Sequence, residues 1–220
     1  MQKLEILWCM MYRVKEIFKS IQGEGFFSGK EAVFLRFTGC NLWNGRKKDR
    51  SKSICNFCDT NFVGTDGKNG GTYNLEKLIS VTKKVWNHTY TSEDKFIVLT
   101  GGEPLLQVND LLIKRLKKEN FFIAVETNGT IKTNLKFDWV TVSPKENAEW
   151  NLRKGDELKV VYPQHKFDLK KIINLDFKYF FLQPKDEQKN RTNILKTINY
   201  CKSHKPWFPS FQIHKSIGIS

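Results

Sequence analysis

Short, nearly continuous apolar runs recur along the chain and alternate with amphipathic stretches. Runs of this kind are typical of strands that are buried on both faces of a parallel sheet. We predict strands over residues 12–18, 32–39, 95–100, 121–126, 139–143, 157–162, 179–183 and 210–214. Strands that alternate with helices predict an α/β fold with a mainly parallel sheet.

The amphipathic stretches predict the helices between these strands. Asn74 suits the N-cap of the first helix. One face of that helix is shared by Leu75, Leu78, Ile79, Thr82, Val85 and Trp86. Pro104 is tolerated in a first helical turn, so we expect it to open a helix that continues to about residue 119. Two further helices are predicted over residues 168–174 and 186–204.

Polar or glycine-bearing clusters follow five of the predicted strands. They read TGC at 38–40, TGGEP at 100–104, ETNG at 126–129, SPK at 143–145 and QPKD at 183–186. In parallel sheets the carboxyl ends of the strands meet at one edge, where ligands and catalytic groups gather. Any one of these clusters could merely end a strand, but their recurrence predicts a functional site at that edge.

The 220 residues fit one domain, 1–220, with residues 1–10 as a possible extension outside its core. Hydrophobic residues make up 40% of the chain, yet no apolar run approaches the length of a membrane-spanning helix. Glu5 interrupts the apolar N-terminus, which makes a poor signal peptide. We therefore expect a cytoplasmic protein without membrane contact, in which disulfides are disfavoured.

The net charge of +14 invites a nucleic-acid hypothesis. The alternative is a lysine-rich surface on solvated helix faces, combined with an anionic small substrate. Residues 112–120 support the alternative, because their cations are spaced between apolar residues at helical intervals. No zinc-finger spacing or aromatic RNA-binding signature occurs, so a nucleic-acid partner is not expected.

Cys40, Cys55 and Cys58 form the clearest chemical motif, with the spacing Cys-x14-Cys-x2-Cys. A Cys-x2-Cys pair lets two sulfurs turn toward one metal centre, and both zinc and a [4Fe–4S] cluster are bound in this way. Three thiolates would leave one position of either metal site open. The spacing alone does not choose between the two metals. The basic segment between Cys40 and Cys55 would offset part of a cluster's negative charge.

The motifs together resemble those of the radical S-adenosylmethionine enzymes, although the usual first gap there is three residues. IQGEG, FLRFTGCNL, CDTN, TGGEP, ETNGT, SPK, QPKD and FQIHK jointly resemble the 7-carboxy-7-deazaguanine synthase family, some members of which have the long gap. The resemblance covers residues 11–220. Cys9 and Cys201 match no motif and are expected to be ordinary small apolar residues.

The resemblance implies an incomplete (β/α) barrel of the radical S-adenosylmethionine type. It implies conversion of 6-carboxy-5,6,7,8-tetrahydropterin to 7-carboxy-7-deazaguanine, with release of ammonia, in 7-deazapurine (queuosine) biosynthesis. The implied cofactors are a [4Fe–4S] cluster, S-adenosylmethionine used catalytically, and Mg²⁺. A 5′-deoxyadenosyl radical would abstract hydrogen from C6 of the pterin. The implied partners are an electron donor such as flavodoxin or ferredoxin and a second copy of the chain in a homodimer.

The resemblance also assigns roles to residues. Cys40, Cys55 and Cys58 would ligate the cluster and Thr60 would ligate Mg²⁺. The positions matched to the cofactor are Gly101, Gly102, Glu103, Ser143, Pro144, Lys145, Gln183, Pro184, Lys185 and Asp186, with the Glu103 carboxylate beside the methionyl ammonium. The positions matched to the substrate are Ile21, Gln22, Gly23, Glu24, Arg36, Thr100 and Ser220, with Glu126 and His214 as catalytic groups.

Several of these residues have a simpler interpretation when taken alone. Thr60 could cap a turn, Arg36 could form a salt bridge at a rim, and His214 could be structural. Some relatives end in proline where this chain has Ser220, so the chain departs from the family pattern at this position. Two rival functions remain at this point: an activase that makes a glycyl radical, and a zinc-binding, basic nucleic-acid module. A brown, anaerobically purified protein would support a cluster, whereas a colourless one with stoichiometric zinc would support the module.

Overall fold

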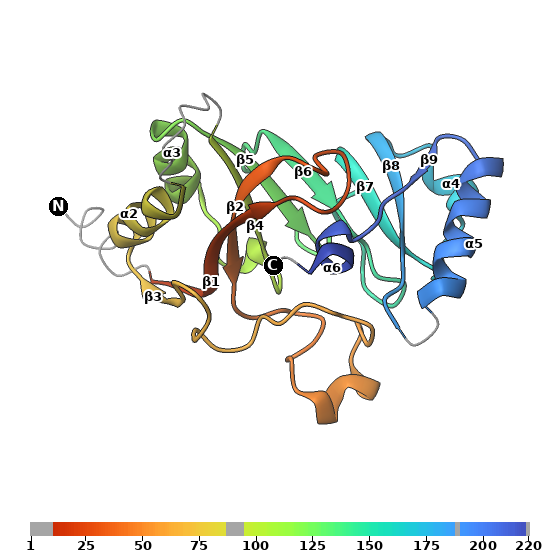
Figure 1. The fold of residues 1–220 in the computed structure, drawn as a ribbon, viewed down its shortest axis with the longest axis horizontal. Helices are drawn as coiled ribbons and strands as arrows, with labels where there is room; N and C mark the ends of the chain where they lie inside the picture. Colours follow the sequence, from red (N-terminus) through yellow and green to blue (C-terminus); the bar gives the residue numbers. More distant parts are fainter. Residues whose placement is uncertain (1–10, 87–94, 188–189, 219–220) are drawn as a thin grey trace.

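The computed structural model describes residues 11–86, 95–187 and 190–218. Within them a single nine-stranded sheet has the order β3-β1-β2-β4-β5-β6-β7-β8-β9. Its strands are β1 (Tyr12–Ile21), β2 (Glu31–Phe37), β3 (Gly71–Tyr73), β4 (Lys95–Gly101), β5 (Phe121–Thr127), β6 (Trp139–Val142), β7 (Lys154–Tyr162), β8 (Asp176–Pro184) and β9 (Trp207–Pro209). Neighbours from β2 to β9 are parallel, and β1 is antiparallel to both β2 and β3. The curved sheet does not close, so it forms an incomplete barrel (Figure 1).

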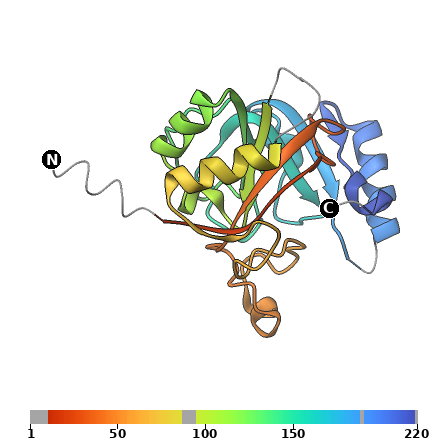
Figure 2. The same cartoon turned by 60° about the vertical axis from the view of Figure 1, so that its left-hand side comes forward.

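The described residues also form five helices and two short 3-10 turns. They are α2 (Leu75–Trp86), α3 (Asp110–Lys118), α4 (Leu169–Ile172), α5 (Asn190–Ser203) and α6 (Ile213–Ile217), with 3-10 turns η1 (Lys47–Lys52) and η2 (Pro104–Leu106). The helices α2 and α3 cover the side of β1, β2 and β5, while α5 lies against β8 and β9 (Figure 2). No helix of the described ranges has both the length and the apolar character needed to cross a membrane.

The α/β architecture and the mainly parallel sheet predicted from the apolar runs are confirmed. The helix at 75–86 is also confirmed, and the side-chain oxygen of Asn74 accepts from the Lys77 backbone nitrogen at 2.9 Å. The predicted helix opening at Pro104 is wrong, because Pro104 begins only η2 and α3 starts afresh at Asp110. A second cap explains this break, since the Asn109 side chain accepts from the Leu112 nitrogen at 3.0 Å.

The strand predicted over residues 210–214 is wrong as well. The last strand, β9, ends at Pro209, and the Ser210 nitrogen donates to the Leu182 carbonyl at 2.8 Å. From there the chain turns across the barrel, and the Ile213 nitrogen donates to the carbonyl of Gly23. That contact with a distant loop opens the short helix α6, which local sequence does not specify.

Alternation along β4 explains why its sequence is apolar throughout. Ile97 and Leu99 join the outer core beneath α2 and α3, whereas Phe96 and Val98 join an inner aromatic core. Successive side chains point to opposite faces of a strand, so both faces of β4 are buried. Thr100 continues the inner face and is the first polar side chain on it.

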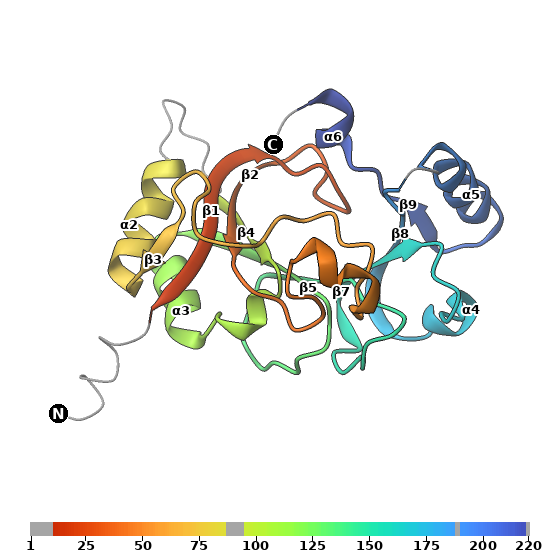
Figure 3. The same ribbon diagram turned by 90° about the horizontal axis from the view of Figure 1, so that it is seen from below.

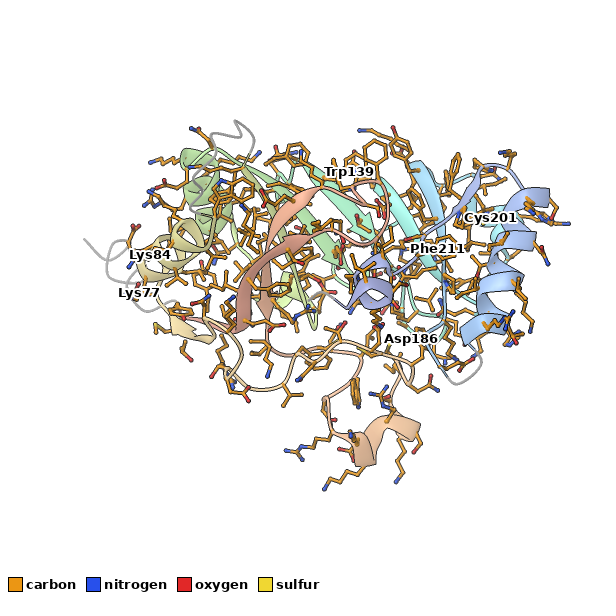
Figure 4. The ribbon with its side chains drawn as sticks, viewed as in Figure 1. Lys77, Lys84, Trp139, Asp186, Cys201 and Phe211 are labelled. Atoms are coloured by element: carbon orange, nitrogen blue, oxygen red, sulfur yellow. The ribbon has the colours of Figure 1, made fainter. Side chains whose placement is uncertain are left out.

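The loop at residues 22–30 closes one end of the barrel. It joins β1 to β2 and so lies at the amino end of the parallel strands, opposite the cysteine segment (Figure 1). The rings of Phe26 and Phe27 pack on Trp139, with centroids 4.8 and 4.7 Å apart. Figure 4 places Trp139 at this upper end and Asp186 at the opposite end. The barrel interior therefore lies between an aromatic plug and the cysteine segment.

Candidate active site

A cavity of about 430 Å³ opens at the carboxyl ends of the barrel strands. Its walls bring together residues from nearly the whole length of the chain. The predicted site residues that line it are Ile21, Gln22, Gly23, Glu24, Arg36, Cys40, Cys55, Cys58, Thr60, Thr100, Gly101, Gly102, Glu126, Ser143, Lys145, Gln183, Pro184, Asp186 and His214. Sequence motifs that are distant in the chain thus share one enclosed space.

The turn that carries Cys40 is held against the end of β4. The Glu103 nitrogen donates to the Gly39 carbonyl at 2.9 Å, and the Gly102 nitrogen donates to the Phe37 carbonyl at 3.2 Å. A Cβ atom added at Gly102 would lie 1.9 Å from the Gly39 carbonyl oxygen. This clash is with the backbone, so rotation of a side chain could not relieve it. The paired glycines therefore allow two backbone turns to meet beside Cys40.

Asn41 fixes the same turn on its other side. The Asn128 amide donates to the Asn41 side-chain oxygen at 2.9 Å, and Asn41 donates to the Thr130 hydroxyl at 2.7 Å. These bonds link the segment after β2 to the segment after β5. Cys40 is consequently positioned by two neighbouring strand ends.

Arg50 braces the segment that carries the other two cysteines. Its guanidinium lies 4.1 Å from the ring centroid of Trp43, and it donates to the carbonyl of Cys58 at 2.8 Å. The surrounding turn η1 has no buried residue and extends away from the barrel, in front of the strand ends in the view of Figure 3. The long first gap thus contains an internal support for Cys58.

The three cysteine thiols differ in acidity: the pKa of Cys58 is lowered, whereas the pKa values of Cys40 and Cys55 are raised. The Cys55 thiol donates to the sulfur of Cys58, which lowers the pKa of Cys58 to about 6 and favours its thiolate at neutral pH. Burial raises the pKa of Cys40, whose sulfur accepts from the Leu42 nitrogen at 3.4 Å. Thiolates are the ligands that iron–sulfur clusters use, and all four described cysteines are free. This donor set fits a cluster.

A buried charge network occupies the other side of the cavity. The Lys159 ammonium lies 2.5 Å from a carboxylate oxygen of Glu24 and 3.7 Å from one of Glu126. Glu126 also accepts from the Gln22 amide at 3.0 Å and from the Thr100 hydroxyl at 3.4 Å. Lys159 was not predicted from the sequence. Its signal in the sequence is a lysine flanked by Leu158 and Val160 within the strand at 157–162, in phase with the inward-facing positions.

Gln183, which the resemblance matches to the cofactor, forms part of this network of buried charges. Its amide donates to Glu24 at 3.3 Å, while its own oxygen is buried without a hydrogen-bond partner in the described residues. The Gln212 amide reaches both Glu24 and Asp59, at 2.8 Å each. Gln212 was not predicted either, because its segment was expected to form a strand.

The short helix α6 ties several segments together at the cavity mouth. Lys215 bridges Asp59, next to Cys58, and Asp186 beyond β8. His214 lies so close to Gly23 that a Cβ atom there would be 2.2 Å from its ring nitrogen Nδ1. A larger residue at position 23 would therefore displace the His214 ring from its present place.

Three predicted site residues do not line the cavity, and one lies outside the described residues. Glu103, Pro144 and Lys185 are absent from its walls, while Ser220 is not described. Glu103 is fully buried, and its carboxylate accepts from Leu105, Thr127 and Asn128 at 3.0, 2.8 and 2.8 Å. These contacts make Glu103 a support of two turns rather than a wall of the site.

Two other predicted residues have partners that modify their expected roles. Arg36 lines the cavity but donates to Glu16 at 2.8 Å, so its charge is shared with a carboxylate. Lys145 donates to the carbonyl and hydroxyl oxygens of Ser143 at 2.6 and 2.8 Å. Burial lowers the pKa of Lys145, and the nearby Cys55 and Cys58 oppose that effect.

The open, mainly parallel barrel with three cysteines at the carboxyl ends of its strands is the architecture of a radical S-adenosylmethionine enzyme. No model of a known protein family matches the chain. Curated relatives do match, and they are 7-carboxy-7-deazaguanine synthases. The chain belongs to the 7-carboxy-7-deazaguanine synthase family. Enzymes of this family use a [4Fe–4S] cluster and S-adenosylmethionine.

The similarity extends over nearly the full length of each relative. The enzyme of Bradyrhizobium diazoefficiens is 49% identical over 211 residues, and that of Caulobacter vibrioides is 48% identical over 211 residues. Both alignments cover 96% of this chain and 100% of the relative. The crystal structure of QueE from Escherichia coli superposes with a TM-score of 0.69 at 26% identity, covering 96% of this chain and 98% of that one. The activase and the zinc module are therefore not supported.

Proposed function

We propose that the chain converts 6-carboxy-5,6,7,8-tetrahydropterin to 7-carboxy-7-deazaguanine with release of ammonia, in the biosynthesis of 7-deazapurines such as queuosine. One observation carries the proposal: the three cysteines face the same cavity as Glu24, Glu126 and the Lys159 ammonium. A cluster bound at one wall would then lie across from groups suited to a polar heterocycle. When bound, the cluster supplies the electron that cleaves S-adenosylmethionine and starts the radical chemistry.

Cys40, Cys55 and Cys58, which all line the cavity, are the residues proposed to hold the cluster, and three protein ligands would leave one iron free to bind S-adenosylmethionine. The cofactor is proposed to lie along the ends of β4, β6 and β8, where Gly101, Gly102, Ser143, Lys145, Pro184 and Asp186 line the cavity. Glu103 supports this wall from behind, through its bonds to Thr127 and the Asn128 backbone.

The substrate is proposed to lie between the cysteine wall and the aromatic plug. Glu24 and Glu126 offer carboxylate oxygens to the N–H groups of the pterin, which resemble a guanidine along one edge. Gln22 and Thr100 already donate to Glu126 and hold its carboxylate in place. Arg36 and His214 are left to face the substrate carboxylate, with Arg36 oriented by Glu16.

Mg²⁺ is proposed to bind Thr60 together with the substrate carboxylate, because this ion prefers oxygen ligands and is often held by few protein groups. We further propose that the chain is a single domain, works in the cytoplasm, receives its electron from a flavodoxin or ferredoxin, and acts as a homodimer. The four cysteines that the structure describes are free rather than paired, which is in keeping with a reducing compartment.

The test is turnover by the anaerobically reconstituted protein. The expected result is formation of 7-carboxy-7-deazaguanine and ammonia from 6-carboxytetrahydropterin, dependent on S-adenosylmethionine and a reductant. A Lys77→Ala variant serves as control, since this side chain is exposed on α2, away from the cavity (Figure 4). Cleavage of S-adenosylmethionine without any change in the pterin would contradict the proposed substrate.

A further inference from the structure

Lys159 lies on the inner face of β7, between three carboxylates that come from different parts of the chain. Its ammonium is 2.5 Å from Glu24 in the 22–30 loop and 3.7 Å from Glu126 on β5. The third is Glu157, two residues earlier on the same face of the same strand, which acts on Lys159 electrostatically. Lys159 is only 5% exposed, so little water screens these interactions.

The third carboxylate has a separate structural task. Glu157 accepts from the Phe26 nitrogen at 3.1 Å, and a Cβ atom added at Gly25 would lie 2.2 Å from its oxygen. Glu157 therefore holds the same part of the loop that carries Glu24, which directly precedes Gly25. It does not line the cavity, whereas Lys159, Glu24 and Glu126 do. One ammonium thus serves two carboxylates that face the cavity and one that supports them.

We propose that Lys159 is a positioning residue for the substrate, holding the carboxylates of Glu24 and Glu126 at a fixed separation so that both can accept hydrogen bonds from the pterin. This inference rests on the proposed function. Without the ammonium, three buried carboxylates would face one another, which is strongly unfavourable in a site of low polarity. They would take up protons or move apart, and either change removes acceptors from the substrate.

The geometry also sets Lys159 apart from the other buried cation of the site. Lys145 lies on the cysteine side, where Cys55 and Cys58 act on it more strongly than Lys159 does. Both described ion pairs of Lys159 are instead with carboxylates, those of Glu24 and Glu126. Loss of Lys159 should therefore weaken substrate binding and leave S-adenosylmethionine binding nearly unchanged. A purely structural ion pair would affect both ligands or only the stability of the fold.

The experiment compares Lys159→Met, Glu157→Gln and the double variant with the wild type and with Lys178→Met. Lys178 is a control, because it forms an ion pair with Asp156 at 2.6 Å but is largely exposed and lies outside the cavity. Steady-state turnover of the pterin by each reconstituted protein gives its KM and kcat. Calorimetry gives the affinity for S-adenosylmethionine, and thermal unfolding gives the melting temperature.

Lys159→Met is expected to raise the KM for the pterin at least tenfold, with S-adenosylmethionine affinity changed less than threefold. At pH 8, above the pKa of Glu157, the KM of the double variant should lie between those of Lys159→Met and the wild type, because removal of the Glu157 charge leaves two carboxylates to repel instead of three. Lys178→Met should match the wild type. An unchanged KM in Lys159→Met, an equal loss of affinity for both ligands, or no recovery in the double variant would each overturn the inference.

A second comparison applies if Lys159→Met does not fold. The double variant is then compared with Glu157→Gln alone. The KM of the double variant for the pterin should be at least threefold higher than that of Glu157→Gln. Equal KM values would overturn the inference. Failure of the proposed function looks different from these results. If the wild type does not transform the pterin, the proposed reaction is wrong, whatever the variants do.

Discussion

The Oε2 atom of Glu103 lies 2.8 Å from the backbone nitrogen of Asn128, although the two residues follow different strands of the barrel. The other carboxylate oxygen accepts from the Thr127 hydroxyl and the Leu105 nitrogen. One fully buried side chain thereby holds the ends of β4 and β5 in register beside the cysteine turn. Such a carboxylate acts on the site through the backbone that it fixes.

We expect Glu103→Ala to lower the free energy of unfolding by about 2–4 kcal/mol, because it leaves buried N–H and O–H donors without an acceptor. Glu103→Gln should cost less, since an amide oxygen can still accept two of the three bonds. Urea unfolding of the protein without its cluster measures both. Glu76→Ala is the control, because its ion pair with Arg115 is exposed, and it should change stability by less than about 1 kcal/mol.

Glu103 also allows a test of its expected contact with the cofactor. The sequence places its carboxylate beside the methionyl ammonium, but the structure encloses that carboxylate away from the cavity. Calorimetry on the folded Glu103→Gln variant should therefore show nearly normal S-adenosylmethionine affinity. A tenfold weaker affinity in a variant of normal stability would favour a direct contact instead.

The cysteine assignment predicts a clear division among substitutions. Replacing Cys40, Cys55 or Cys58 by alanine should abolish cluster assembly, because each supplies one of three ligands. Cys201→Ala is the matched control: this thiol is buried in the core between α5 and β8, far from the cavity (Figure 4). Iron and sulfide analysis after anaerobic reconstitution decides the matter. Full iron loading in any of the first three variants would remove that residue from the ligand set.

Most of the sheet could be predicted because buried parallel strands have a strong local signature. Alternate residues of a strand point to the same face, and this rule would also have located Lys159. Lys159 shares the inward-facing positions of its strand with Glu157 and Val161. The break between η2 and α3 was harder to find, because two caps compete within a continuous helical pattern. The helix α6 depends on its contact with Gly23, which lies almost two hundred residues away in the chain.

In the candidate site too, local sequence patterns predict some residues, whereas others depend on tertiary contacts. Motifs at strand ends located Cys40, Thr100, Glu126 and Gln183, because strand ends converge in parallel sheets. The spacing of the cysteines located Cys55 and Cys58. The plug formed by Phe26 and Phe27 could not be foreseen in this way, because its loop enters from the opposite end of the barrel. The bridge from Lys215 to Asp59 and Asp186 is likewise a product of tertiary structure.

The proposed magnesium site predicts an effect on turnover but not on folding. Removing Mg²⁺ should lower turnover of the pterin substrate and leave melting temperature and iron content unchanged, because the substrate carboxylate forms part of the site. Thr60→Ala should mimic metal removal, whereas Thr60→Ser keeps the hydroxyl and should keep most of the response. Thr72→Ala, at an exposed position on β3, is the control. If Thr60→Ala responds to Mg²⁺ as the wild type does, Thr60 is not a ligand.

Glu157 gives the protein a specific dependence of stability on pH. Burial is the main cause that raises the pKa of Glu157 to about 7, and Lys159 only partly opposes it. Between the ordinary carboxyl pKa and pH 7, the unfolded chain has lost this proton while the folded chain still holds it. The contribution of this group to the free energy of unfolding is therefore fully present below the ordinary carboxyl pKa, and it is lost as the pH rises through about 7.

Glu157→Gln removes that titration, since the amide stays neutral at every pH and its oxygen can still accept from Phe26. The free energy of unfolding of the variant, minus that of the wild type, should rise between pH 5 and pH 8 by about 2–3 kcal/mol. Urea unfolding under reducing conditions, repeated across this range, gives the difference, in which other titrating groups largely cancel. The exposed Glu149→Gln variant should give a flat difference. A flat difference for Glu157→Gln would mean that Glu157 is already ionised in the folded protein below pH 5, and that the Lys159 ammonium outweighs its burial.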